Sequence, residues 1–304
     1  VTGVSGNGCS SFSTVSLTVI PNPVVSVSAG SPAICIGSLT SLSASGASTY
    51  SWSPSTGLSG TTGSLVAASP VISTTYVVQG TSASGCTATS SINITVNSLP
   101  VASITNASSN TICPGNSILL STTSTGSGLT YQWYRGATLL NGATADTYSA
   151  SAAGNYSVQI TDGNSCSTRT GAVSVSLFSL PAVSSTVLPN DSVCDGQAVT
   201  FSGTGAISYS WSGGISDGVS FTPSGTSTYT VTGTDGNGCT NTAVANVTVI
   251  PYPAIQSITG DTSIVDGVTY NYHITSSFGT FYQWIIQGGT IQNGQGTNSV
   301  DLIW

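Results

Sequence analysis

The chain is almost without charge. It has no Lys, no Glu and no Met, and charged residues make up 4% of its 304 residues, against about 25% in ordinary globular domains. The only bases are Arg135 and Arg169, and the net charge of −7 comes from nine Asp. The residues that favour surface helices are therefore scarce. No basic groove for nucleic acid and no polybasic patch for anionic lipid is present, so neither partner is predicted.

Long apolar segments are also missing. No run approaches the roughly 20 residues that a spanning helix needs, so membrane insertion is not predicted. No signal peptide is visible. The strand pattern starts just before Cys9 and stops at Trp304 inside a repeat. We therefore expect the natural protein to extend beyond both ends of this sequence.

The side chains for catalysis are equally few. The single His, His273, sits on a strand pattern and is interpreted as a surface or edge-strand residue. No Ser-His-Asp arrangement recurs with the repeats, and nothing marks two of the nine Asp as the converging pair of a hydrolase. The sequence predicts no catalytic, cofactor-binding or metal residue, and no enzyme.

Calcium is the one cofactor that two segments suggest. Asp162-Gly163-Asn164 and Asp235-Gly236-Asn237 offer oxygen atoms in turns. Calcium takes six to eight oxygen ligands, and the EF-hand spacing is absent. A plain Asx turn, in which the Asp side chain accepts backbone N–H groups, is the favoured interpretation.

What the chain does have is an internal repeat. A Tyr lies ten residues before a Cys three times, and a fourth copy of the Cys turn opens the chain at Gly6-Asn7-Gly8-Cys9. The turn cysteines are 77, 80 and 73 residues apart, and the Trp of a Tyr-x-Trp triplet recurs every 81, 78 and 73 residues. A unit of this length suits one small all-β domain.

Alternation of apolar and polar residues predicts the strands. The last strand of each unit is apolar on one face, as in Ile92, Ile94 and Val96, and the stretch with Val15, Leu17 and Val19 repeats the pattern. About seven short strands per unit suggest a β-sandwich, and Ser, Thr, Val and Gly suit strands and turns. The Trp is expected between the sheets and the Tyr at a tyrosine corner. These core markers are Trp52, Trp133, Trp211, Trp284, Tyr76, Tyr156 and Tyr229.

Pro-containing joints divide the units. They predict tandem immunoglobulin-like sandwiches in an extended rod, because joints of one to three residues leave little freedom. Residues 1–20 would be the C-terminal part of one domain. Residues 21–98, 99–180 and 181–250 would be complete domains. Residues 251–304 keep Tyr282-Gln283-Trp284 but lack both cysteines, and are interpreted as the N-terminal part of a PKD-like or Ig-like domain.

The seven cysteines fit disulfides better than metal ligands, because no CxxC motif or Cys/His cluster occurs. Disulfides imply an oxidising, extracytoplasmic setting. The favoured pairing is within each unit, which leaves Cys9 unpaired in this chain. The alternative is a bond between neighbouring units, because the two cysteines of a strict Ig-like sandwich lie at opposite poles. The favoured pairs are Cys35 with Cys86, Cys113 with Cys166, and Cys194 with Cys239.

Several segments together resemble a known group. Cys35-Ile36-Gly37, Tyr50-Ser51-Trp52-Ser53-Pro54, Thr75-Tyr76-Val77-Val78 and Gly85-Cys86 resemble the tandem Ig-like and PKD-like repeats of Bacteroidetes secreted surface proteins. Asp191-Ser192-Val193 resembles their O-glycosylation acceptor, with Ser192 as the modified residue; a chance tripeptide is the alternative.

The resemblance implies an extracellular, cell-surface protein that is exported by the type IX system, as giant gliding adhesins are. The expected function is a non-catalytic stalk or filament segment of a large adhesin. Two alternatives are spacer repeats of a secreted enzyme and a glycan-binding array that uses loops 57–63 and 139–144. The expected partners are neighbouring repeats, and beyond them extracellular glycans or surfaces and the secretion or anchoring machinery.

Overall fold

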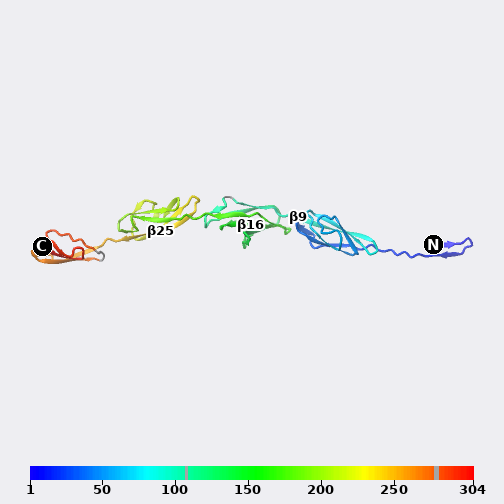
Figure 1. Cartoon of the computed structure of the whole chain (residues 1–304), viewed down its shortest axis with the longest axis horizontal. Helices are drawn as coiled ribbons and strands as arrows, with labels where there is room; N and C mark the ends of the chain where they lie inside the picture. The colour runs from blue at the N-terminus through cyan, green and yellow to red at the C-terminus, as the bar shows by residue number, and fades with distance from the viewer. Residues whose placement is uncertain (107–108, 277–280) are drawn as a thin grey trace. The chain divides into compact units, whose positions relative to one another are not determined.

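The computed structural model describes residues 1–106, 109–276 and 281–304. Within these ranges the regular structure is β, apart from one 3-10 turn, η1 (Ser212–Gly214). The chain divides into two compact units, Val1–Leu177 and Phe178–Trp304. In the described ranges each strand pairs within its own segment of the chain, so every repeat has its own sheets (Figure 1).

The first complete repeat is a two-sheet sandwich of seven strands. One sheet has the order β3-β5-β7 and the other β4-β9-β8-β6. Neighbours are antiparallel except β4 and β9, which run parallel. The bounds are β3 (Ser26–Ala29), β4 (Ala33–Cys35), β5 (Thr40–Ser45), β6 (Thr49–Ser53), β7 (Leu65–Ala68), β8 (Thr74–Thr81) and β9 (Thr87–Asn97).

Alternation along these strands builds the core. In β5 the side chains of Leu42 and Ala44 are buried and the intervening Ser are exposed. They meet Trp52, Val78 and Ile94 from the opposite sheet. A period of two places one set of side chains between the sheets and leaves Ser and Thr outside.

The second repeat has the same plan. Its sheets are β10-β12-β15 and β11-β18-β16-β13-β14, with β17 paired to β16. Strand β11 runs parallel to β18, the last strand. The bounds are β10 (Ala102–Asn106), β11 (Thr111–Ile112), β12 (Ile118–Ser124), β13 (Thr130–Arg135), β14 (Thr138–Leu139), β15 (Thr147–Ala150), β16 (Gly154–Thr161), β17 (Ser167–Arg169) and β18 (Val173–Leu177).

The third repeat returns to seven strands, in sheets β19-β21-β23 and β20-β25-β24-β22. Phe201 fills its core and stacks on Trp211, with ring centroids 5.0 Å apart. The bounds are β19 (Ser184–Leu188), β20 (Ser192–Cys194), β21 (Val199–Thr204), β22 (Ser208–Trp211), β23 (Ser220–Phe221), β24 (Ser227–Thr234) and β25 (Thr240–Ile250).

The two ends of the chain hold single sheets. The N-terminal segment has only the hairpin of β1 (Thr2–Val4) and β2 (Ser10–Phe12). The C-terminal segment has one four-stranded sheet, in the order β26-β27-β29-β28. Its strands are β26 (Ile255–Thr259), β27 (Thr269–Ser276), β28 (Thr290–Asn293) and β29 (Ser299–Ile303).

The strand that the sequence predicts around Val15, Leu17 and Val19 is not formed. Residues 13–25 have no strand, and these three side chains are fully exposed. A strand needs neighbouring backbone groups to bond and an apolar face to cover. Neither lies beside this segment, so the alternating pattern alone does not produce a strand.

Candidate functional site

The cysteines occupy the two ends of each sandwich. In the first repeat Cys35 ends β4 and lies opposite Asn97, the last residue of β9. Cys86 directly precedes Thr87, the first residue of β9. Eleven residues of strand at about 3.3 Å each hold these two cysteines more than 30 Å apart. A disulfide needs Cα atoms within about 7 Å, so Cys35 and Cys86 cannot bond.

Cys35 instead bonds Cys166 of the next repeat. Their Cα atoms are 5.5 Å apart, and 131 residues separate them in sequence. The favoured prediction of bonds within each repeat was wrong, and the alternative of a bond between neighbouring repeats is correct for this pair. The structure shows that Ala33–Cys35 is a strand parallel to β9, which carries the thiol to the C-terminal end of the repeat.

The other two predicted pairs also fail. Cys166 is already bonded to Cys35, so it is not the partner of Cys113. Cys194 is a free, exposed thiol, so it is not bonded to Cys239. Cys113 and Cys239 are themselves disulfide-bonded.

Two further thiols complete the set. Cys86 is free and partly buried, against the prediction that it is bonded. Cys9 is free and exposed, in the N-terminal hairpin. The free cysteines thus occur at both kinds of position: Cys86 precedes the last strand of its repeat, and Cys194 lies beside the end of the last strand.

The turn that presents Cys166 is shaped by Asp162. Its Oδ1 accepts hydrogen bonds from the backbone N–H groups of Asn164 and Cys166, both at 2.9 Å. Asp235 does the same for Asn237 and Cys239. These carboxylates are the acceptors of Asx turns, the interpretation that the sequence favoured over a calcium site. Among the described residues, no group of three or more His, Cys, Asp or Glu is placed to hold a metal ion.

The aromatic markers line the sandwich interiors. Trp52, Trp133 and Trp211 are buried, whereas Trp284 in the last segment is only partly so. Each indole N–H donates to an oxygen six to thirteen residues downstream. The acceptors are Gly63 O at 2.8 Å, Ala145 O at 2.9 Å, Asp217 Oδ1 at 2.8 Å and Thr297 O at 2.9 Å.

The tyrosines before the turn cysteines differ from one another. Tyr156 is buried and its hydroxyl donates to Ala152 O, four residues upstream, as in a tyrosine corner. Tyr76 is buried too, but its hydroxyl donates to Thr56 O in a distant loop. Burial raises the pKa of the Tyr76 phenol. Tyr229 is only partly buried.

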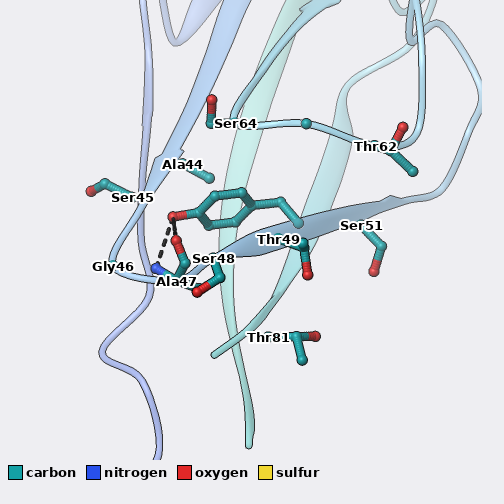
Figure 2. Close-up of a pocket in the computed structure, with 12 residues that line it drawn as sticks. Ala44, Ser45, Gly46, Ala47, Ser48, Thr49, Ser51, Thr62, Ser64 and Thr81 are labelled. Carbon is teal, nitrogen blue, oxygen red and sulfur yellow. Dashed lines mark hydrogen bonds between the residues drawn. The ribbon is translucent and has the colours of Figure 1, made fainter. Parts of the chain in front are cut away.

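An open groove lies at one end of the first repeat, between residues 44–51, residues 62–64 and Thr81 (Figure 2). Its lining is Ser, Thr, Gly, Ala and one Tyr, without a charged side chain. The Tyr50 hydroxyl accepts from Ala47 N–H and donates to Ala47 O, the bonds dashed in Figure 2. Tyr209 makes the same two bonds to Ala206. In both repeats the tyrosine hydroxyl therefore holds a turn closed.

Gly46 is required by this clamped turn. Its φ is +96°, and a Cβ there would lie 1.8 Å from Val24 O. Gly205 holds the equivalent place, with a Cβ 2.0 Å from Ala182 O. Both glycines let the chain that enters the repeat pass directly over the turn.

The remaining predicted positions lie on the surface. Ser192 is exposed at the start of β20, and His273 is exposed on β27.

Arg169 was not predicted to have a particular role. Its guanidinium lies 4.0 Å from the centre of the Tyr134 ring and donates to Ser157 Oγ and Gly136 O. Tyr134 and Gly136 follow Trp133, where this repeat departs from the Trp-Ser-Pro pattern.

One family profile matches part of the chain. Residues 100–177 match the family described as "Ig-like domain CHU_C associated". This range coincides with the second sandwich. The matched sequence and the sheet order confirm the prediction of an all-β chain of tandem Ig-like sandwiches.

Solved structures of Ig-like arrays are similar to this chain at low identity. Titin domains I67–I69 share 12% identity, with 76% of this chain and 100% of that chain covered and a TM-score of 0.39. A Ca2+-stabilised adhesin that helps an Antarctic bacterium bind ice shares 14%, covering 93% and 91%, with a TM-score of 0.35. No protein with curated annotation matches the chain. In the described part of the chain, no helix has the length and apolar character to cross a membrane.

Proposed function

We propose that this chain is a non-catalytic structural segment, a stalk of tandem Ig-like repeats, in a large adhesin on a bacterial cell surface. The observation that carries the proposal is the Cys35–Cys166 bond, which joins two consecutive repeats rather than locking one. Such a bond limits how far neighbouring repeats can bend or rotate against each other. Such a restriction of movement between repeats is favourable in a structural stalk, which needs stiffness.

The surface supports the same proposal. Charged residues are 4% of the sequence, and the groove in Figure 2 is lined by neutral side chains. A disulfide between repeats needs an oxidising compartment, which favours an extracellular location. Export by the type IX system, a Bacteroidetes source and a role in gliding are part of the proposal through the resemblance of the repeat motifs. The repeat limits are proposed as 21–98, 99–180 and 181–250, with partial domains at 1–20 and 251–304.

Repeat replacement in the native adhesin tests this function. Residues 21–250 would be exchanged for the same number of unrelated Ig-like repeats, and cell adhesion to the natural surface would be measured. A stalk should keep its adhesion after the exchange and lose it when the repeats are simply deleted. Loss of adhesion after the exchange, with the protein still displayed, would show instead that these repeats bind the target.

A further inference from the structure

The two kinds of cysteine position mark opposite ends of every sandwich. Cys194 lies beside Ile250, the last residue of β25, as Cys35 lies beside Asn97. Cys239 directly precedes β25, as Cys86 directly precedes β9. One position therefore lies at the C-terminal end of its own sandwich, and the other lies at the N-terminal end.

The Cys35–Cys166 bond shows what these positions do when two repeats meet. The cysteine at the C-terminal end of one sandwich bonds the turn cysteine at the N-terminal end of the next. No part of that arrangement is particular to these two repeats. It needs only a strand beside the last strand, a four-residue turn before the last strand, and a short joint.

The Cys86 turn reproduces the Cys166 turn. Ser82 N–H donates to Cys86 O at 2.9 Å, and Asp162 N–H donates to Cys166 O at 2.9 Å. Ser82 Oγ accepts from Cys86 N–H as Asp162 Oδ1 accepts from Cys166 N–H. The residue before each cysteine has positive φ, +85° at Gly85 and +64° at Ser165. Both thiols are therefore held by the same backbone geometry.

The Cys86 thiol also points toward the preceding part of the chain. Its Sγ lies 4.0 Å from the carbonyl oxygen of Ile20, in the segment that leads into the repeat. It is only partly buried, so another thiol has access to it. In the second repeat the equivalent sulfur is fully buried because Cys35 covers it.

We propose that Cys86 is a linkage site, which forms a disulfide with the C-terminal-end cysteine of an Ig-like repeat joined directly before residue 21. The inference rests on the proposed stalk function, since it extends the link between two repeats into a rule for the array. The rule is that the cysteine at the C-terminal end of one repeat bonds the turn cysteine of the next repeat. Under this rule the three free cysteines, Cys9, Cys86 and Cys194, have partners in repeats outside the three described sandwiches. The observed set of free thiols thus follows from one rule.

The bond forms by thiol–disulfide exchange with a disulfide-bearing oxidant of the extracytoplasmic space. The thiolate of one cysteine attacks the oxidant's disulfide and forms a mixed disulfide, releasing one thiolate. The second cysteine then attacks the mixed disulfide, closes the protein bond and releases the oxidant's other sulfur. Two protein thiols lose two electrons and two protons, and the oxidant becomes a dithiol.

A duplicated repeat tests the proposal within the full chain. A second copy of residues 21–98 is inserted after residue 20, with Ile36→Val in the first copy as a mass label beside Cys35. Ile36 is 41% exposed, so the change is tolerable. Peptides from acid proteolysis without reductant should join the labelled Cys35 of the first copy to Cys86 of the second. The Cys35–Cys166 link of the second copy reports in the same digest that the repeats have folded and oxidised.

Two results would overturn the proposal. One is alkylation of Cys86 in the second copy without reductant while the Cys35–Cys166 link is intact. The second result comes from the unmodified chain. In that chain Cys86 should react fully with a maleimide, and Cys35 should not react. A disulfide from Cys86 to another cysteine within residues 21–98 would contradict the rule. Neither result bears on adhesion after repeat exchange, so the stalk function and the linkage site fail separately.

Discussion

At the scale of residues, a few polar side chains perform the same task in more than one repeat. The turn before the last strand is held by Ser82 in the first repeat and by Asp162 in the second. An aromatic hydroxyl clamps the turn at Ala47 and again at Ala206. These polar contacts satisfy backbone groups where strands end, so they set the positions of the cysteines rather than providing reactive groups.

Replacing Asp162 should loosen the Cys166 turn. Asp162→Ala removes the acceptor of two backbone N–H groups, and a loss of about 1–3 kcal/mol of local stability is expected. Asp162→Ser is the matched control, because Ser82 already fills this role in the first repeat. Hydrogen exchange of peptides covering 160–169 should accelerate in the Ala variant and much less in the Ser variant. Equal protection from hydrogen exchange in the Asp162, Asp162→Ala and Asp162→Ser proteins would contradict the proposed role of the carboxylate.

Tyr76 should make the first repeat sensitive to alkali. Burial raises the pKa of its phenol in the folded state above the unfolded value, which is about 10. Its contribution to stability is therefore present below about pH 10 and is lost as pH rises through the folded pKa. Stability against denaturant should fall across that window, and Tyr76→Phe, which cannot ionise, should weaken the dependence. An identical alkaline loss in the Phe variant would assign the effect to other groups.

At the scale of elements, the short strand β4 decides the disulfide pattern. Its three residues run parallel to the end of β9 and set Cys35 beside Asn97. The length of β9 then separates this cysteine from the turn at Cys86. The pairing is a consequence of strand direction and length, which fix which thiols share an end of the sandwich.

Substitution of the two turn cysteines should therefore have unequal effects. Cys166→Ser breaks a bond that closes a segment of 131 residues, for which the chain-entropy estimate is at most about 5 kcal/mol. Thermal unfolding of repeats 21–98 and 99–180 should shift downward together. Cys86→Ser is the control in the equivalent turn, and it should leave both transitions in place because Cys86 carries no bond. A similar shift in both variants would mean that the turn, and not the bond, is responsible.

At the scale of the whole molecule, the bond changes the path that tension takes through the chain. The residues between Cys35 and Cys166 lie inside a covalent loop, so a pull on the termini is carried by the sulfur bridge. As long as the Cys35–Cys166 bond is intact, the strands inside the loop do not carry the load. A surface stalk under shear benefits from such a bypass.

Single-molecule pulling should show the covalent loop as a shorter contour length of the unfolded chain. In a chain that carries Cys113→Ser and Cys239→Ser, Cys35–Cys166 is the disulfide under test. The unfolded oxidised protein should then be shorter than the reduced one. The deficit is 131 residues, or about 430–470 Å at 3.3–3.6 Å each. A Cys35→Ser addition should abolish the difference. Equal contour lengths with and without reductant would show that the link does not form in solution.

The fold class and most of the core can be predicted from the residue pattern. Alternation with a period of two predicts the buried face of each strand. Trp52, Trp133 and Trp211 lie inside, as expected of large apolar side chains on the inward face of a strand. The recurrent spacing predicts separate sandwiches, since each copy carries a complete set of inward residues. Such features are local, so they can be recognised from neighbouring residues.

The disulfide pairing, in contrast, depends on contacts between residues that are distant in sequence. Ala33–Cys35 carries one buried Ile between two less buried residues, too short a pattern to predict a strand or its direction. Its parallel pairing with β9 comes from contacts made 62 residues later in sequence, between Cys35 and Asn97. The same limit explains Val15, Leu17 and Val19, whose pattern matches a last strand but which have no sheet to join. Partners distant in sequence settle both outcomes, because a strand is stable only against its neighbours.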